Sequence, residues 1–152
     1  MAFRAWSTAF DDGGTIPARH SKEGENVAPA IEWAEPPSGT RSFALLCKDP
    51  DAPSGVFTHW LIWDIPGDVS SIAEGFTPGL VGVSGTNDFG EEGYGGPLPP
   101  KGHGPHRYIF KVLALDMKRI PLPHGARHGE FERALWGHVI EEAHVTGRYE
   151  RS

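Results

Sequence analysis

The chain alternates between short apolar stretches and loops rich in proline and glycine. Three stretches have the length of ordinary strands and are predicted to form the main sheet: Ser42–Cys47, His59–Ile65 and His106–Asp116. The last is the longest, and both of its alternating sets of side chains are mostly apolar, as in a central strand covered on both faces. The looser patterns of Phe3–Phe10 and Asn26–Pro37 predict two shorter extended segments.

Only one segment has the spacing of a helix. Phe131, Leu135 and Val139 recur at every fourth residue, which would place them on one face of a helix. We therefore predict a helix over Glu130–Ala143. No Ser, Thr or Asp stands at its start to cap the first turn, so packing must hold this helix in place.

These elements predict a mainly β fold with antiparallel strands and one helix in the C-terminal half. The 152 residues suit one domain, and no repeat or linker divides them, so we expect a single domain over residues 1–152. The 14 prolines predict many fixed turns and few long helices. All five tryptophans are expected in the core: Trp6, Trp33, Trp60, Trp63 and Trp136.

The formal net charge of −6 at pH 7 argues against a nucleic-acid partner, which would require a basic face. The one cysteine, Cys47, cannot form a disulfide within the chain. No apolar run approaches the ~18 residues of a membrane-spanning helix. The first residues also lack the basic and apolar regions of a secretory signal. We therefore expect a cytoplasmic protein without a transmembrane segment.

Two loops carry the residues that could form a binding site. Lys48–Pro53 places two carboxylates between prolines directly after a predicted strand, and rigid polar loops at strand ends often bind ligands. Tyr94–Tyr108 is rich in glycine, which exposes backbone amides, and it carries His106 at the start of a strand. Together with His59, these groups predict a pocket for an anion. The alternative is a pair of loops that bind nothing.

The same groups could perform acid–base chemistry, with Asp49 orienting His59 or His106. No nucleophile is evident, because Cys47 lies in an apolar strand and neither a Gly-x-Ser-x-Gly turn nor a phosphate-binding Gly-x4-Gly-Lys-Ser/Thr loop is present. A binding protein is therefore favoured over a small-molecule enzyme, which remains an alternative.

Histidine pairs at His103 and His106 and at His124 and His128 have spacings that a metal could tolerate. No neighbouring carboxylate or thiolate in the sequence completes either set of ligands. We therefore predict no metal and no cofactor.

Two motifs resemble the signature regions of the phosphatidylethanolamine-binding protein family. The first is Asp49–Pro53, followed by His59 and Trp60, and the second is Gly96–Tyr108. The bacterial and archaeal members, called Raf kinase inhibitor-like proteins, are the most similar, and the resemblance covers nearly the whole chain. It implies a large antiparallel sheet packed against a smaller sheet, with a small surface cavity that binds phosphate-like anions.

The resemblance also implies which residues form that cavity. Asp51 and Trp60 would support it, Arg107 would pair with Asp51 to brace the two loops, and a cis peptide bond is expected at Ala52–Pro53. Two departures are Leu98, where eukaryotic relatives have a glycine, and Asp64, where an asparagine is usual. The residues expected to line the cavity are Asp49, Pro53, His59, Gly96, Pro100, His106 and Tyr108.

The implied function is the binding of phosphate or of a phospholipid headgroup such as phosphoethanolamine, together with modulation or inhibition of a partner kinase or protease. A homodimer is one expected assembly, because bacterial relatives often pair. An inhibitor that acts by surface contact and a scaffold with a vestigial pocket remain alternatives. An anion beside Asp49 requires a compensating positive charge, so we expect anion binding to take up a proton on His59 or His106 and to strengthen at lower pH.

Overall fold

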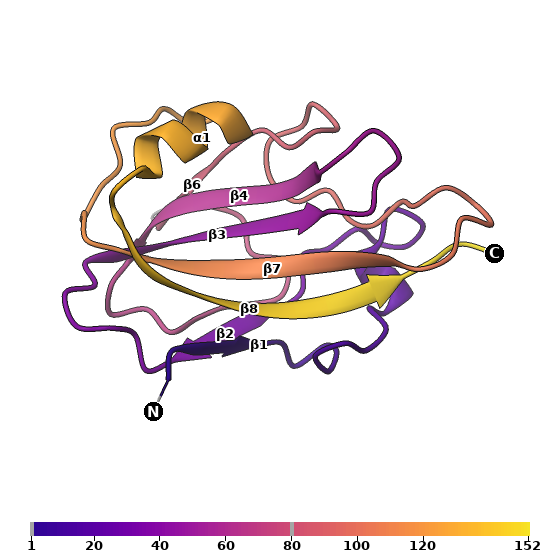
Figure 1. Cartoon of the computed structure of the whole chain (residues 1–152), viewed down its shortest axis with the longest axis horizontal. Helices are drawn as coiled ribbons and strands as arrows, with labels where there is room; N and C mark the ends of the chain where they lie inside the picture. The colour runs from indigo at the N-terminus through magenta and orange to yellow at the C-terminus, as the bar shows by residue number, and fades with distance from the viewer. Residues whose placement is uncertain (1, 80) are drawn as a thin grey trace.

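The computed structural model describes residues 2–79 and 81–152. Its regular elements form two antiparallel sheets and one α-helix, which confirms the predicted mainly β fold (Figure 1). In chain order, the elements are β1 Arg4–Trp6, the short 3-10 helix Ala18–His20, β2 Ile31–Ala34, β3 Ser42–Asp49, β4 Phe57–Pro66, β5 Ser71–Ile72, β6 Val83–Ser84, β7 His106–Leu115, α1 His128–Leu135 and β8 Val139–Tyr149.

The larger sheet has five strands in the order β6-β4-β3-β7-β8. Its three central strands contain the three apolar stretches that were predicted as the main strands. β3 lies in the middle and is buried at nearly every position, because other elements cover both faces of the sheet. Asp49, the last residue of β3, pairs with Phe57, the first residue of β4. The end of β3 and the start of β4 therefore lie side by side at one end of the sheet, next to the start of β7.

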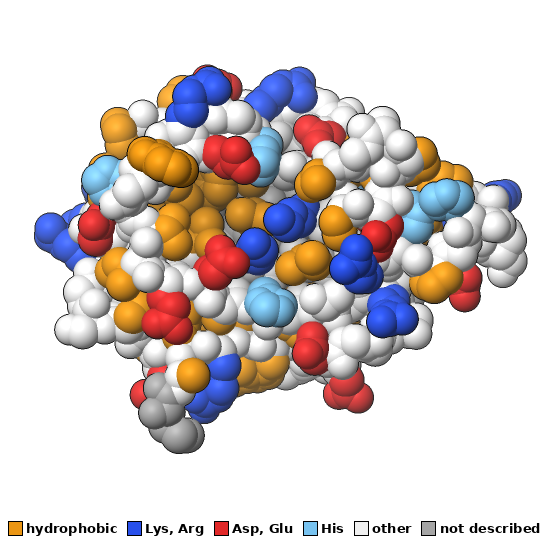
Figure 2. Space-filling view, in the orientation of Figure 1, with side chains coloured by type: hydrophobic (Ala, Val, Ile, Leu, Met, Phe, Trp, Pro, Cys, Tyr) orange, Lys and Arg blue, Asp and Glu red, His pale blue; other side chains and the backbone are white. Residues whose placement is uncertain are grey.

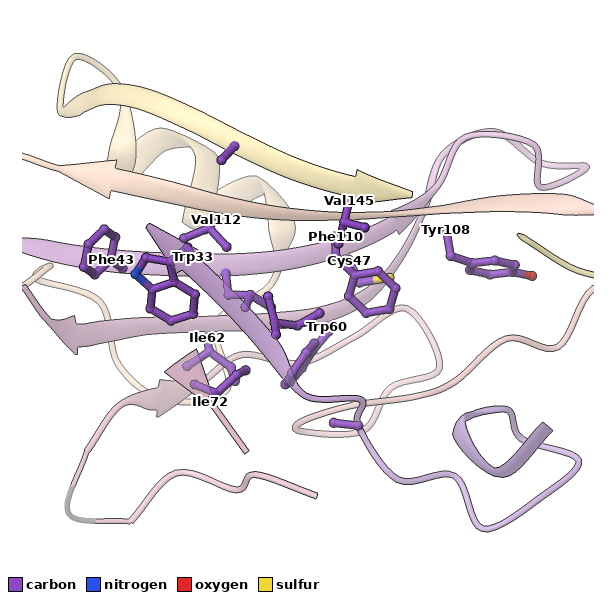
Figure 3. Packing of buried hydrophobic residues seen from close by; sticks show 14 of the residues in the cluster. Trp33, Phe43, Cys47, Trp60, Ile62, Ile72, Tyr108, Phe110, Val112 and Val145 are labelled. Carbon is purple, nitrogen blue, oxygen red and sulfur yellow. The ribbon is translucent and has the colours of Figure 1, made fainter. Parts of the chain in front are cut away.

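The smaller sheet has the order β1-β2-β5 and packs against one face of the larger sheet. Large side chains from both sheets fill the space between them, as Figure 3 shows for Trp33, Phe43 and Phe110. Trp33 and Phe43 lie on different sheets, and their ring centroids are 5.2 Å apart. Burial of these apolar surfaces is the main stabilising contribution expected for such a core.

The helix α1 covers the opposite face of the larger sheet (Figure 1). Phe131 and Leu135 are its buried residues, and they pack against Leu46, Trp63 and Leu113. The first turn lacks a Ser, Thr or Asp cap, but Oε1 of Glu130 accepts a hydrogen bond from the backbone amide of Arg127 at 3.2 Å. One of the free amides at the helix start is thereby satisfied.

The predicted helix over Glu130–Ala143 is wrong in its second half. α1 ends at Leu135, Gly137 has a φ of 81°, and the chain then enters β8, which pairs antiparallel with β7. A positive φ is accessible to glycine at little cost, so the chain reverses there. From Ala143 to Tyr149 alternate residues are buried, and this two-residue period belongs to a strand.

The same change of structure overturns one expectation for the core. Trp136 follows the last residue of the helix and is 84% exposed, and Trp6 is only half-buried, whereas Trp33, Trp60 and Trp63 are buried as predicted. Val139 and Ile140, just beyond the turn, are each 40% exposed. Apolar surface therefore remains uncovered beside α1.

Candidate ligand-binding site

A cavity of about 240 Å³ opens where β3 ends, β4 begins and β7 begins. The loop between β3 and β4 forms one wall, and the segment before β7 forms another. The strands hold the polar side chains in fixed positions, as is common for sites at strand ends. The lining residues are Asp49, Ala52, Pro53, Ser54, Phe57, His59, Phe89, Leu98, Pro100, His106 and Tyr108.

Six of the seven residues expected at the cavity lie in its lining: Asp49, Pro53, His59, Pro100, His106 and Tyr108. The seventh, Gly96, lies outside the lining, and its amide already donates to Oδ1 of Asn26 at 2.7 Å. A Cβ at this position would collide with the carbonyl oxygen of His20. Gly96 is therefore required for close packing next to the site, and its amide is not free for an anion.

Asp49 is buried, and its carboxylate holds two parts of the site together. One oxygen, Oδ1, accepts from the backbone amide of Asp51 at 2.7 Å, and the other, Oδ2, accepts from Nδ1 of His106 at 2.7 Å. Nε2 of His106 lies 2.7 Å from Nδ1 of His103. With His106 donating to Asp49, its neutral ring has no proton on Nε2 and accepts there from His103.

His59 is also held by one ring nitrogen. Its Nδ1 lies 2.7 Å from the carbonyl oxygen of Gly95, and a carbonyl only accepts, so Nδ1 carries the proton. Nε2 is then unprotonated in the neutral ring. Burial lowers the pKa of His59 below its ordinary value, although the Gly95 carbonyl and Asp49 oppose this effect. The ring is therefore neutral near pH 7 in the absence of a ligand.

Tyr108 contributes a hydroxyl that has no hydrogen-bond partner among the described residues, although the side chain is fully buried. Burial, and secondarily the charge of Asp49, raises the pKa of Tyr108 above its ordinary value. The ring lies edge-on to His59, with centroids 5.2 Å apart. An unsatisfied buried hydroxyl is costly, so this group is available to a ligand.

Arg107 braces the cavity from outside, as the resemblance implies. Its Nη2 and Nε donate to the two carboxylate oxygens of Asp51 at 2.8 and 3.0 Å, and its backbone amide donates to Oδ2 at 2.9 Å. These bonds join the loop after β3 to the start of β7. The Arg107 guanidinium holds the pKa of Asp51 down at about 2.

Replacing Arg107 with glutamine is expected to raise the pKa of Asp51 from about 2 toward its ordinary value of 3.8. A depressed carboxylate pKa stabilises the fold above pH 3.8, and that stability is lost as the pH falls toward 2. Removing the guanidinium should therefore weaken the acid dependence of folding in this range. A side-chain carbon NMR titration measures the change, and an unaltered pKa would contradict the assigned cause.

The peptide bond at Ala52–Pro53 is trans, so the expected cis bond is wrong. The loop turns by another route, since the amide of Gly55 donates to the carbonyl of Ala52 at 3.1 Å. Gly55 has a φ of 112°, which only glycine adopts readily. The turn therefore closes with every peptide in the usual trans form.

Three residues at the site lie outside the set expected from the motifs. Phe57 and Phe89 flank His59, with ring centroids 4.8 and 5.4 Å from the imidazole, and His103 contacts His106. Phe57 could have been found, because it lies two residues before His59 and so on the same face of the strand. Phe89 lies in a loop, and no local sequence pattern predicts its contact with His59.

The remaining singled-out residues serve other contacts. Trp60 faces the core between the sheets, and Asp64 has a φ of 57° and accepts from the amide of Ile120 at 2.8 Å. An Asp tolerates that conformation, as an asparagine does.

The two histidine pairs considered for a metal make other contacts. His124 pairs with Glu92, and His128 with Glu132. Within residues 2–79 and 81–152, no cluster of three His, Cys, Asp or Glu is arranged to hold a metal ion.

Comparison with known proteins accounts for the fold and the motifs together. A family model described as Phosphatidylethanolamine-binding protein matches residues 6–150 of the chain. A UPF0098 protein of Aquifex aeolicus is 44% identical over 149 residues, covering 96% of this chain and 87% of that protein. The UPF0098 protein YbhB of Escherichia coli is 40% identical over 154 residues, covering 94% and 97%.

The crystal structure of E. coli YbcL, described as a new member of the mammalian PEBP family, superposes with a TM-score of 0.93. It is 34% identical in sequence, and the match covers 100% of both chains. None of the described helices is both long enough and apolar enough to cross a membrane. The chain belongs to the phosphatidylethanolamine-binding protein family.

Proposed function

We propose that this chain is a binding protein that takes a small oxyanion, such as phosphate or a phospholipid headgroup, into the cavity at the ends of β3, β4 and β7. One observation carries the proposal: two buried imidazoles and an unsatisfied buried hydroxyl, from His59, His106 and Tyr108, line the same small cavity. A hydroxyl and protonated imidazoles are donors suited to an oxyanion. Family membership supports a binding role in general.

Both oxygens of Asp49 are engaged, by His106 and by the amide of Asp51, so its negative charge beside an anion must be offset by a proton on an imidazole. The carboxylate serves to fix the Nδ1 proton on His106, while the Gly95 carbonyl does the same for His59. Both Nε2 atoms are then unprotonated acceptors. A fully ionised oxyanion also only accepts, so His59 must gain a proton before its Nε2 can donate, and Nε2 of His106 must part from the His103 ring, 2.7 Å away, to reach the anion.

Binding of a fully ionised oxyanion should therefore become stronger as the pH falls. Sulfate is the suitable probe, since its own charge does not change between about pH 8 and 6.5. Each proton taken up should raise the affinity about tenfold per pH unit. Calorimetric titration in buffers of different ionisation enthalpy counts these protons, and we expect one or two per sulfate.

The matched variants are His59→Ala in the cavity and His124→Ala on the surface. His59→Ala should weaken sulfate binding and remove one proton from the count, whereas His124→Ala, 78% exposed and paired with Glu92, should leave both unchanged. Affinity that stays constant from pH 8 to 6.5 would contradict the proposed mechanism. Comparing inorganic phosphate with phosphoethanolamine then distinguishes a free anion from a headgroup.

Inhibition of a partner kinase or protease is a further part of the proposal, and it rests on the family resemblance alone. His59→Ala separates it from anion binding: a partner that binds through a different surface should still bind this variant. An acid–base enzyme remains the alternative, in which His59→Ala would abolish turnover of a phosphoester. Cys47 supplies no nucleophile, because it is buried in the core between the sheets and burial raises the pKa of its thiol.

A further inference from the structure

A second hollow lies on the outer face of the larger sheet, beneath α1, and shares no residue with the anion cavity. Figure 2 shows it as a recess with an apolar floor, with basic side chains at its inner end. We call it the helix groove. Its volume is about 480 Å³, and it is lined by Leu46, Lys48, Lys111, Leu113, His128, Phe131, Glu132, Leu135, Trp136, Gly137, Val139 and Glu142.

The helix groove is apolar along one side. Leu46 and Leu113 form its floor from β3 and β7, and Leu135 reaches it from α1. At its outer edge Trp136 is 84% exposed and Val139 is 40% exposed. Large apolar side chains that gather beside a hollow indicate a binding surface more strongly than single exposed residues do.

The inner end of the helix groove is basic. Lys111 pairs with Leu46 across the β3–β7 ladder, and Lys48 lies two residues beyond Leu46 on the same face, so the two lysines are neighbours. Lys111 contacts Glu142 at 3.1 Å. Within residues 2–79 and 81–152, no carboxylate lies within 4.0 Å of the Lys48 amine.

The lining holds two lysines and two glutamates, and Lys48 is the lysine that has no carboxylate of the described residues within 4.0 Å, because Glu142 contacts Lys111. His128 and Glu132 at the opposite rim contact each other at 3.2 Å. Partial burial, together with the neighbouring Lys111, lowers the pKa of Lys48. A like charge beside a half-buried amine is unfavourable, and an anion placed between the two lysines would relieve it.

We propose that the helix groove binds an amphipathic carboxylate, with its alkyl chain over Leu46 and Leu113 and its carboxylate between Lys48 and Lys111. The volume lies within the range of small-molecule sites, which are mostly apolar with a few polar groups that fix orientation. This site is independent of the oxyanion cavity.

The test is calorimetric titration with decanoate below its micelle concentration, beside decylamine and decanol as probes of the same chain length. Decanoate should bind at one site, and decylamine should not. The double variant Lys48→Gln, Lys111→Gln should weaken decanoate binding at least tenfold, whereas Lys118→Gln, an exposed lysine outside the groove, should leave it unchanged. Lys48→Arg should retain binding, which distinguishes a lost charge from a damaged fold.

Three results would overturn the proposal. The double variant could bind decanoate as the wild type does, or decylamine could bind equally well. Third, the protein could be a dimer that Trp136→Ser converts to a monomer. That result would mean that a second copy covers the groove. Sulfate binding should persist in the double variant, so failure of this site is distinguishable from failure of the oxyanion cavity.

Discussion

Replacing Phe131 with alanine is expected to lower the free energy of unfolding by about 3–5 kcal/mol. Phe131 is 1% exposed and contacts Trp63, with ring centroids 5.8 Å apart. It is the largest side chain that α1 buries against the sheet. An eight-residue helix is not stable alone, so its position depends on this contact. The truncation would leave a cavity above Trp63 and loosen α1.

The matched control is Trp136→Ala, which removes an even larger aromatic side chain just past the same helix. Because Trp136 is 84% exposed, its loss should change the free energy of unfolding by no more than about 0.5 kcal/mol. Urea unfolding, followed by circular dichroism, measures both variants. Equal effects would show that the buried contact does not hold the helix.

The strands could be predicted because their apolar runs are buried on both faces. β3 and β4 are covered by the smaller sheet on one side and by α1 on the other, so their side chains are apolar whichever way they point. The end of the helix could not be predicted in the same way. Phe131, Leu135 and Val139 fit a helical period by coincidence, since Gly137 reverses the chain between them.

In the site, too, positions on strands could be predicted and contacts made by loops could not. Motif residues on strands, such as His59 and His106, lie in the lining of one cavity, because strand register fixes their positions. Contacts made by loops depend on tertiary packing instead. The amide of Gly96 donates to Asn26, and His103, in the loop before β7, contacts His106 at the start of that strand. No periodicity in the sequence encodes either contact.

Replacing Asp49 with asparagine is expected to change how many protons anion binding requires. The carboxylate accepts from both the Asp51 amide and Nδ1 of His106. An asparagine side chain can accept only through its oxygen, so if it keeps the Asp51 amide, its NH₂ group faces His106. His106 must then accept at Nδ1 and carry its proton on Nε2, where it can donate to a bound oxyanion without protonation once the oxyanion displaces the His103 ring, which lies 2.7 Å from this nitrogen.

The variant should therefore bind sulfate at least about tenfold more tightly at pH 8, with about one proton fewer taken up and a correspondingly flatter pH dependence. Nitrogen NMR of the His106 ring reports which nitrogen carries the proton. Asp116→Asn is the matched control, because it makes the same chemical change at a carboxylate that accepts from a histidine, Nδ1 of His138 at 2.8 Å, and lies outside the cavity lining. If Asp49→Asn instead left His106 protonated on Nδ1 with an unchanged proton count, the buried carboxylate would not be what fixes the tautomer, and the pH dependence would have to arise from His59 alone.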